Sequence, residues 1–248
     1  SAGSCHDMHD GTETGLGVVD RIGETGCERS VMAVLRKFHN ASTCVFVATA
    51  RIEQQLRDSG FTAPMVRLLR GVDYDLFYPA PHPKRAEPPR LLYVGRVSKE
   101  KNIEAFLNLP IAAEKIVVGD GPLLPHLRKD YGSVRFTGSL TGRALADAYR
   151  DADVFVFPSR TDTFGIVLIE ALASGLPIAA FDEPGPSDIM GHDPTLGAIS
   201  DTDLADAVRR ALAAKGSPQE RHEKTKARYS WPEVADVFHK NLVCESHG

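Results

Sequence analysis

Two carboxylates, Asp162 and Glu170, flank the start of an unusually apolar helix that the sequence predicts near Ile166. A helix that is apolar almost all round belongs inside a domain, where a carboxylate is costly unless it is paired or hydrogen-bonded. The sequence supplies no obvious partner for Glu170, and two vicinal hydroxyls of a ribose would supply one. The alternatives are a core arginine as the partner of Glu170 and a loop or capping role for Asp162.

Gly165 comes directly before this helix and removes the side chain that would block access to its first turn. The first turn of a helix has free backbone N–H groups at the positive end of the helix dipole. A phosphate or a sugar hydroxyl can bind there.

The loop at residues 95–102 follows an expected strand at 91–94 and carries two cations, Arg96 and Lys101, five residues apart. Gly95 lets the backbone approach a ligand closely. The planar donor fork of arginine and the point charge of lysine suit a diphosphate. The alternative is a solvated basic loop beside Glu100.

The turn Gly119-Asp120-Gly121-Pro122 follows the next expected strand, at residues 115–118. It lacks the third glycine of a dinucleotide fingerprint, and no ribose-reading acid is recognisable about 20 residues further on. The P-loop pattern is absent from the chain as well. The sequence therefore indicates no NAD site, and phosphate binding falls to the other loops.

The elements that must position these loops alternate regularly along the second part of the chain. Apolar strands are expected at residues 91–94, 115–118, 134–137, 153–157 and 178–181, with helices between them and two or three helices at the end (202–214, 218–228 and 232–242). Buried strands that alternate with helices predict an α/β fold with a doubly wound, Rossmann-like parallel sheet. Ligands of such sheets bind at the carboxyl ends of the strands, where each of the glycine-containing loops lies.

The composition excludes several classes of protein. The 248 residues are 42% hydrophobic with a net charge of -4, and they show no basic stripe of the kind that nucleic-acid binding requires. No apolar run reaches the length of a membrane span, and the first ten residues do not resemble a signal peptide. Four scattered cysteines indicate reduced thiols and a cytoplasmic location. Cys5, His6 and His9 lie in a polar terminus and are not expected to bind a metal.

Three blocks together resemble one family. They are residues 91–102 (LLYVGRVSKEKN), 117–122 (VVGDGP) and 157–177 (FPSRTDTFGIVLIEALASGLP). In this order and spacing they resemble the donor-binding domain of the family-four retaining glycosyltransferases of the GT-B fold. The most similar members are the bacterial mannosyl- and glycolipid-type enzymes, including the sulfoquinovosyl-transferase-like group. The resemblance extends over residues 31–245.

The resemblance implies a domain organisation. Residues 1–30 are expected to be loop or disordered, and residues 31–79 resemble a remnant of the amino-terminal acceptor domain with its crossover. The four prolines of residues 80–89 mark a linker. Residues 90–228 would form the nucleotide-sugar-binding domain, and residues 229–248 a C-terminal helix. About 150 residues of the usual acceptor domain are not recognisable in the chain.

The resemblance also implies a role for each site residue. Arg96 and Lys101 would hold the diphosphate of a nucleotide-sugar donor, and Glu170 the ribose hydroxyls. Asp162 stands where the family usually has glutamate and would face the donor sugar, which leaves the identity of that sugar open. The remaining contacts would come from the backbone of Gly95, Gly119, Gly138, Phe164, Gly165, Ile166 and Val167.

The implied reaction moves a hexose from GDP-mannose or a UDP-hexose to a sugar or lipid acceptor with retention of configuration. No metal or other cofactor is expected, because the two cations and the helix start would stabilise the leaving diphosphate. Glycolipid-type relatives allow a peripheral membrane association. The alternatives are a nucleotide-sugar-binding module without turnover and another GT-B enzyme, such as an epimerase or a phosphorylase.

Overall fold

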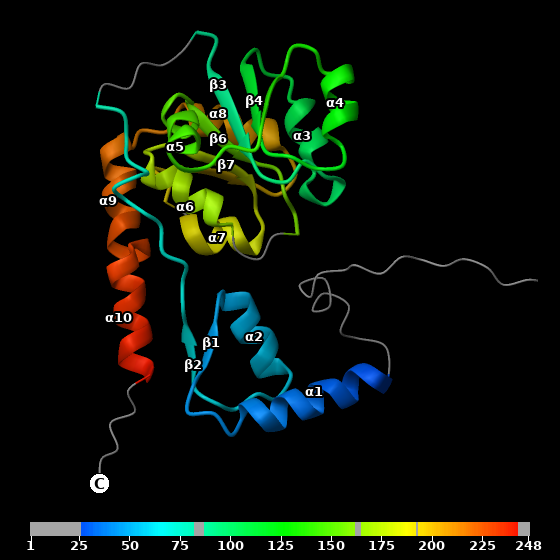
Figure 1. Cartoon of the computed structure of the whole chain (residues 1–248), viewed down its shortest axis with the longest axis vertical. Coiled ribbons are helices and arrows are strands. Elements are labelled where there is room, and N and C mark those ends of the chain that lie inside the picture. Colours follow the sequence, from blue (N-terminus) through cyan, green and yellow to red (C-terminus); the bar gives the residue numbers. More distant parts are fainter. Residues whose placement is uncertain (1–25, 82–86, 162–164, 192, 243–248) are drawn as a thin grey trace, which may run out of the picture.

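The computed structural model describes residues 26–81, 87–161, 165–191 and 193–242 (Figure 1). Its larger unit is a six-stranded sheet in the order β5-β4-β3-β6-β7-β8, in which each neighbouring pair is parallel. The strands are β3 (Arg90–Val94), β4 (Glu114–Val118), β5 (Arg135–Gly138), β6 (Val154–Phe157), β7 (Ile178–Phe181) and β8 (Gly197–Ser200). This architecture confirms the predicted α/β class with a doubly wound parallel sheet.

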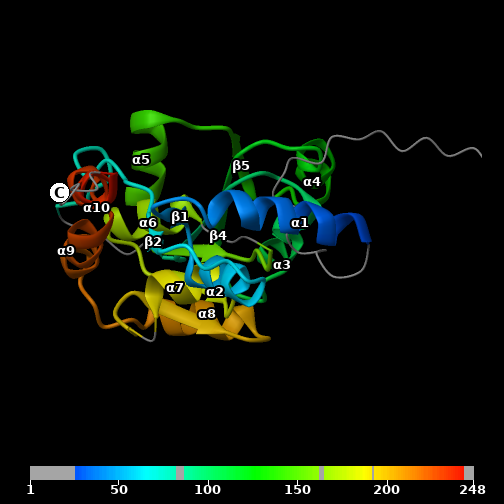
Figure 2. The same ribbon diagram turned by 90° about the horizontal axis from the view of Figure 1, so that it is seen from below.

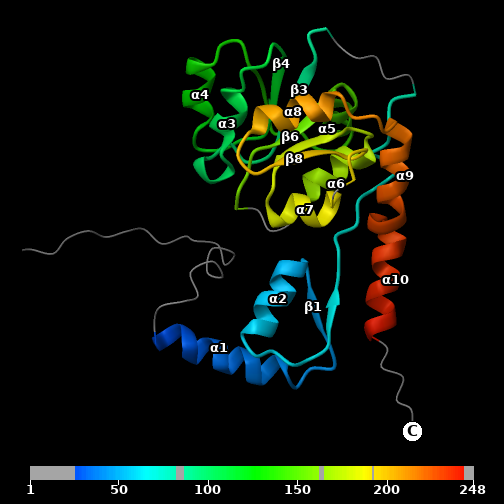
Figure 3. The ribbon, with the colours of Figure 1, turned by 180° about the vertical axis from the view of Figure 1, so that it is seen from behind.

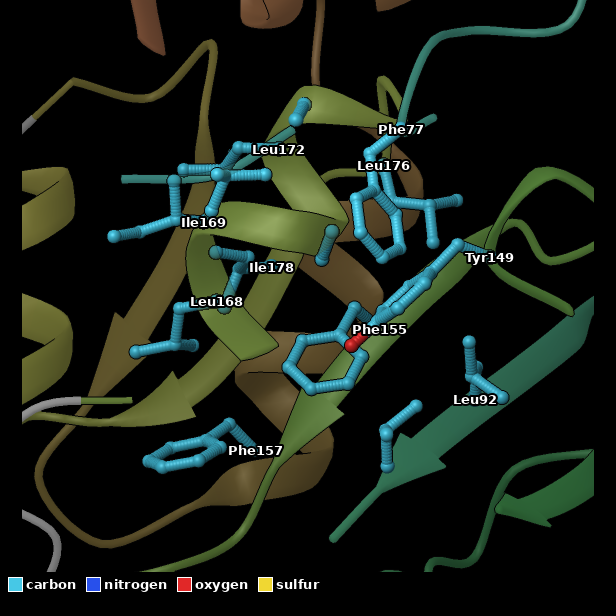
Figure 4. Close-up of a cluster of buried hydrophobic side chains, with 14 of the residues drawn as sticks. Phe77, Leu92, Tyr149, Phe155, Phe157, Leu168, Ile169, Leu172, Leu176 and Ile178 are labelled. Atoms are coloured by element: carbon cyan, nitrogen blue, oxygen red, sulfur yellow. The ribbon is translucent and has the colours of Figure 1, made fainter. Parts of the chain in front are cut away.

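Successive strand residues enter different hydrophobic cores, because side chains of a strand point alternately to the two faces of the sheet. In β6, Phe155 and Phe157 pack on one face while Val154 and Val156 pack on the other, and all four are buried. Figure 4 shows the first of these cores, where Phe155 lies among the leucines and isoleucines of the neighbouring helix and strand. Burial on both faces explains why the sequence of this strand is continuously apolar.

Helices cover both faces of the sheet and complete three layers (Figures 1 and 3). One face packs against α5 (Gly142–Arg150), α6 (Ile166–Ala173) and α7 (Pro184–Met190). The other face packs against α3 (Ile103–Leu107), α4 (Leu124–Asp130) and α8 (Leu204–Leu212). A short 3₁₀ turn, η2 (Lys99–Lys101), precedes α3.

A smaller unit precedes the large sheet in the chain. It contains α1 (Gly26–His39), β1 (Val45–Val47), α2 (Ala50–Asp58) and β2 (Met65–Arg67), with β1 and β2 paired in parallel. The backbone N–H of Ala50 donates to Asp188 Oδ2 on α7 at 3.1 Å, which ties α2 to the larger unit. Figure 2 shows this unit from below, with α1 and α2 in front of the large sheet. One side of α1 leaves Val34 and Phe38 about 70% exposed.

Two C-terminal helices, α9 (Pro218–Tyr229) and α10 (Trp231–Leu242), run along both units (Figure 1). The buried Arg221 fixes α9, because its Nε donates to Thr195 O at 2.7 Å and its Nη1 to Gly175 O at 3.1 Å. On α10, the ring of Phe238 lies 5.3 Å from the ring of Phe46 on β1. None of the helices in the described ranges is both long and apolar enough to cross a bilayer.

Three features differ from the sequence-based expectations. The first helix begins at Gly26, within residues 1–30, which were expected to be loop or disordered, whereas the separate helices α9 and α10 agree with the expected helices at 218–228 and 232–242. Helix α7 was not among the expected helices, although a proline at the first helical position is compatible with a helix. Strand β8 has only four residues, two of which are Gly and Ser, and it gave no strand signal. The expectation for residues 1–25 lies outside the described residues, as does half of the proline-rich linker (residues 82–86).

Candidate functional site

Three neighbouring parallel strands end at the same edge of the sheet, so the predicted glycine loops that follow them lie close together. Gly95 and Arg96 follow β3, Gly119 and Asp120 follow β4, and Gly138 ends β5. The ends of β3 and β4 and the segments that follow the three strands line a hollow of about 250 Å³. Its lining residues are Val94, Gly95, Arg96, Val118, Gly119, Asp120, Ser139 and Leu140.

The backbones of these loops lie so close together that glycine is required at one position. Gly119 N–H donates to Gly138 O at 2.8 Å, and Gly95 N–H donates to Val118 O at 3.0 Å. A Cβ on Gly119 would lie 1.9 Å from Gly95 O, and the φ of Gly119 is 142°. Both observations exclude a side chain there, so the floor of the hollow is bare backbone that a ligand can approach.

The two predicted cations lie in one loop at this edge. Arg96 is exposed, and its Nη1 lies 4.0 Å from Glu100 Oε1. An exposed ion pair of this kind contributes little to stability, so it does not hold the guanidinium away from a ligand. The Tyr93 hydroxyl donates to Arg96 O at 2.7 Å and fixes the backbone of the loop. Lys101 is the last residue of η2, and it is half-buried.

The loop of the two cations is tied to the loop that follows β6. Asn102 has a left-handed φ of 51°, and its Nδ2 donates to Pro158 O at 3.0 Å. The Thr161 hydroxyl donates to Glu100 O at 3.3 Å. Arg160 joins the same segment to the next two strands, because it donates to Glu183 at 3.1 Å and to Asp201 O at 3.1 Å. These contacts therefore connect the segments that follow β3, β6, β7 and β8.

Gly165 is the residue before α6, as the sequence predicted, and Ile166 and Val167 form the first turn. A Cβ on Gly165 would lie 3.2 Å from a carbon of Leu168 and 3.3 Å from Phe157, so the position is crowded. The backbone N–H groups of a first turn lack partners inside the helix. Asp162 and Phe164 lie outside the described residues.

Glu170 has a protein partner that the sequence did not reveal. The Tyr149 hydroxyl on α5 donates to Glu170 Oε2 at 2.9 Å. The chain itself therefore supplies the partner that was not obvious from the sequence, and among the described residues that partner is this tyrosine and not a core arginine. Burial raises the pKa of Glu170 above its ordinary 4.5, and the hydrogen bond from Tyr149 offsets only part of that rise. A tyrosine on the apolar face of α5 was the available signal, because a buried tyrosine hydroxyl usually needs a partner.

The raised pKa predicts how pH affects stability through Glu170. Between pH 4.5 and the raised value, the folded state binds more protons than the unfolded state, so this group lowers the free energy of unfolding as pH rises. We expect Glu170→Gln to gain stability relative to the parent protein as pH rises from 4.5 to 7.5. Urea unfolding at the two pH values measures this change, with Glu104→Gln as an exposed control. A stability difference that does not vary with pH would contradict the assignment.

The match to known families agrees with this arrangement. Residues 88–214 match the model of a family described as "Glycosyl transferases group 1". The chain belongs to this family.

Two curated relatives are similar to this glycosyltransferase-family chain. The sulfoquinovosyl transferase SQD2 of Arabidopsis thaliana is 34% identical over 182 residues, which are 66% of the chain and 36% of that protein. A GDP-mannose-dependent alpha-mannosyltransferase of Mycobacterium tuberculosis is 33% identical over 230 residues, which are 84% of the chain and 58% of the enzyme. The chain thus spans little more than half of the mannosyltransferase.

A solved structure supports the fold assignment. The Anabaena protein HepE in complex with UDP superposes with a TM-score of 0.72 at 16% identity, covering 86% of the chain and 67% of HepE. This likeness confirms the GT-B, Rossmann-like fold class.

Proposed function

We propose that the chain is the nucleotide-sugar-binding part of a glycosyltransferase that moves a hexose from a nucleoside-diphosphate donor to an acceptor. The observation that carries the proposal is the bare-backbone hollow between Gly95 and Gly119, which adjoins the loop of Arg96 and Lys101. Bare backbone, two cations and a helix start are the features that bind a diphosphate. Family membership gives this site its reaction class.

The proposed chemistry follows from where charge develops. As the bond between the sugar and the diphosphate breaks, the sugar becomes cationic and negative charge grows on the leaving phosphate. Arg96, Lys101 and the first turn of α6 would stabilise that charge from fixed positions. In this proposal no metal or other cofactor takes part, Glu170 accepts from the ribose hydroxyls, and Asp162 faces the donor sugar.

Retention of configuration belongs to the same proposal. A single face of the donor sugar would carry both the leaving diphosphate and the incoming acceptor hydroxyl. The covalent scheme of retaining hydrolases, with two carboxylates, is then not needed.

The donor is proposed to be GDP-mannose or a UDP-hexose. The mycobacterial relative is GDP-mannose-dependent by name, and HepE was solved with UDP. A sugar or lipid acceptor, a peripheral membrane association and a cytoplasmic location complete the proposal. The backbone of residues 137–140, part of which lines the hollow, is the proposed neighbour of the base.

Thermal unfolding with a panel of UDP-, GDP- and ADP-sugars tests the proposal. A ligand at 100 times its dissociation constant adds about 2.7 kcal/mol to the free energy of unfolding, so the cognate donor should raise the Tm by several degrees. No shift with any nucleotide sugar would contradict the proposal. Product analysis with labelled donor then separates a transferase, which releases the nucleoside diphosphate, from a binding module that leaves the donor intact.

A further inference from the structure

The hydroxyl of Tyr149 is the closest described polar partner of the Glu170 carboxylate. It lies 2.9 Å from Glu170 Oε2 and 3.4 Å from Val167 O, one turn earlier on α6. A phenol carries one proton, and the shorter contact to a carboxylate receives it. Among the residues that the structure describes, Oε1 of Glu170 accepts no hydrogen bond.

The ring of Tyr149 is fixed by packing, so the position of its hydroxyl oxygen is fixed as well. The residue is fully buried, and its ring meets Phe77 edge-on at 5.8 Å and Phe155 at 5.7 Å. Figure 4 shows the hydroxyl oxygen of Tyr149 beside the ring of Phe155, inside the cluster that holds α6 against the sheet. A donor locked in this way can orient the side chain that accepts from it.

The direction of this hydrogen bond is fixed as well. Burial and the adjacent carboxylate raise the pKa of Tyr149 well above its ordinary value of 10. Tyrosine therefore remains the donor at every working pH, and Glu170 remains the acceptor. The bond favours the ionised carboxylate, which is the form that can accept from two ribose hydroxyls.

We propose that Tyr149 is a positioning residue for the nucleotide: its hydroxyl holds one oxygen of Glu170 and leaves the other for the ribose. This inference rests on the ribose role proposed for Glu170 above. Tyr149 itself does not touch the ligand. Its effect reaches the ligand through the orientation and ionisation of one carboxylate.

The experiment compares nucleoside diphosphates with their 2′-deoxy forms by calorimetry on the 248-residue chain. UDP and GDP are the probes, with dUDP and dGDP as partners that lack one ribose hydroxyl. In the parent protein the 2′-hydroxyl should strengthen binding about 10-fold or more, since it donates to a charged acceptor. Tyr149→Phe should reduce this ratio at least about 3-fold, while the affinity for the deoxy form, which keeps the 3′-hydroxyl, falls by a smaller factor.

Two further variants make the outcomes distinguishable. Glu170→Gln removes the charge and should reduce the ratio to nearly 1. Tyr74→Phe deletes a tyrosine hydroxyl from the same buried cluster without touching Glu170, and should leave the ratio unchanged. If Glu170→Gln keeps the parent ratio, or no nucleoside diphosphate binds, the ribose role proposed for Glu170 fails and the inference fails with it. If Glu170→Gln loses the ratio but Tyr149→Phe keeps it, only the role of Tyr149 is overturned.

A second measurement does not depend on the folding of Tyr149→Phe. The buried hydroxyl proton of Tyr149 is shielded from solvent and is a target for proton NMR in the parent protein. Saturating UDP or GDP should shift this resonance, because the proton and the ribose would share one carboxylate. The 2′-deoxy forms should shift it less. A resonance that stays unchanged at saturation would overturn the proposal.

Discussion

Alanine at both Arg96 and Lys101 is expected to weaken the binding of UDP or GDP by about 100-fold or more. Each cation would make charge-assisted hydrogen bonds to the diphosphate, and each such contact contributes about 1.5–3 kcal/mol. That range corresponds to roughly 10- to 100-fold in affinity for each residue. Calorimetry on the two single variants and the double variant measures the loss.

Lys99→Ala is the matched control for this prediction. Lys99 is exposed in the same loop, between Ser98 and Glu100, and it has no proposed contact with the ligand. Its removal changes the local charge by the same amount and should weaken binding only about 2-fold, because an exposed charge acts through solvent. Equal effects of Lys99→Ala and Arg96→Ala would show that the loop acts only through its overall charge.

Most of the sheet could be predicted from the sequence because most of its strands are short apolar runs, which are recognisable from local sequence alone. Strand β6 is four apolar residues in a row, and Gly95 and Gly119 follow directly on the apolar ends of β3 and β4. Helix α7 and strand β8 could not be predicted in the same way. A helix that opens with Pro184, Gly185 and Pro186 is held by packing and by its position after β7 rather than by helix propensity.

The parts of the candidate site that depend on local sequence, such as the glycine turns, could be predicted. The contact between two helices that are separate in the sequence was missed. Gly95, Gly119 and Gly138 are recognisable because a strand that ends in glycine marks a bare turn. The partner of Glu170 lies 21 residues earlier in the chain and reaches it only because α5 and α6 pack on the same face of the sheet. No spacing rule within one element encodes such a contact, so the carboxylate was expected to depend on a ligand.

Gly119→Ala is expected to reduce the free energy of unfolding by about 3 kcal/mol or more and to abolish nucleotide binding. The new Cβ would lie 1.9 Å from Gly95 O, a backbone atom that cannot turn aside as a side chain would. The φ of 142° adds backbone strain of about 1–3 kcal/mol. Relief of the clash requires the loops after β3 and β4 to separate, which breaks the hydrogen bond between Gly95 N–H and Val118 O. Those two loops form the floor of the hollow.

Two other glycines separate the causes of this effect. At Gly142 the φ is positive, at 53°, and a Cβ would meet nothing within 4 Å, so Gly142→Ala should cost only about 1–2 kcal/mol of strain. At Gly132 a Cβ also meets nothing within 4 Å, and Gly132→Ala should be nearly neutral. Urea unfolding measures the free energy of unfolding of the three variants, and calorimetry with UDP or GDP measures their nucleotide affinity. If Gly119→Ala costs no more than Gly142→Ala, the loops separate easily, and the bare-backbone floor is not rigid enough to preorganise a diphosphate. A cost well above that of Gly142→Ala, with binding lost in this variant alone, would show that the close approach of the Gly95 and Gly119 loops both stabilises the sheet edge and shapes the site.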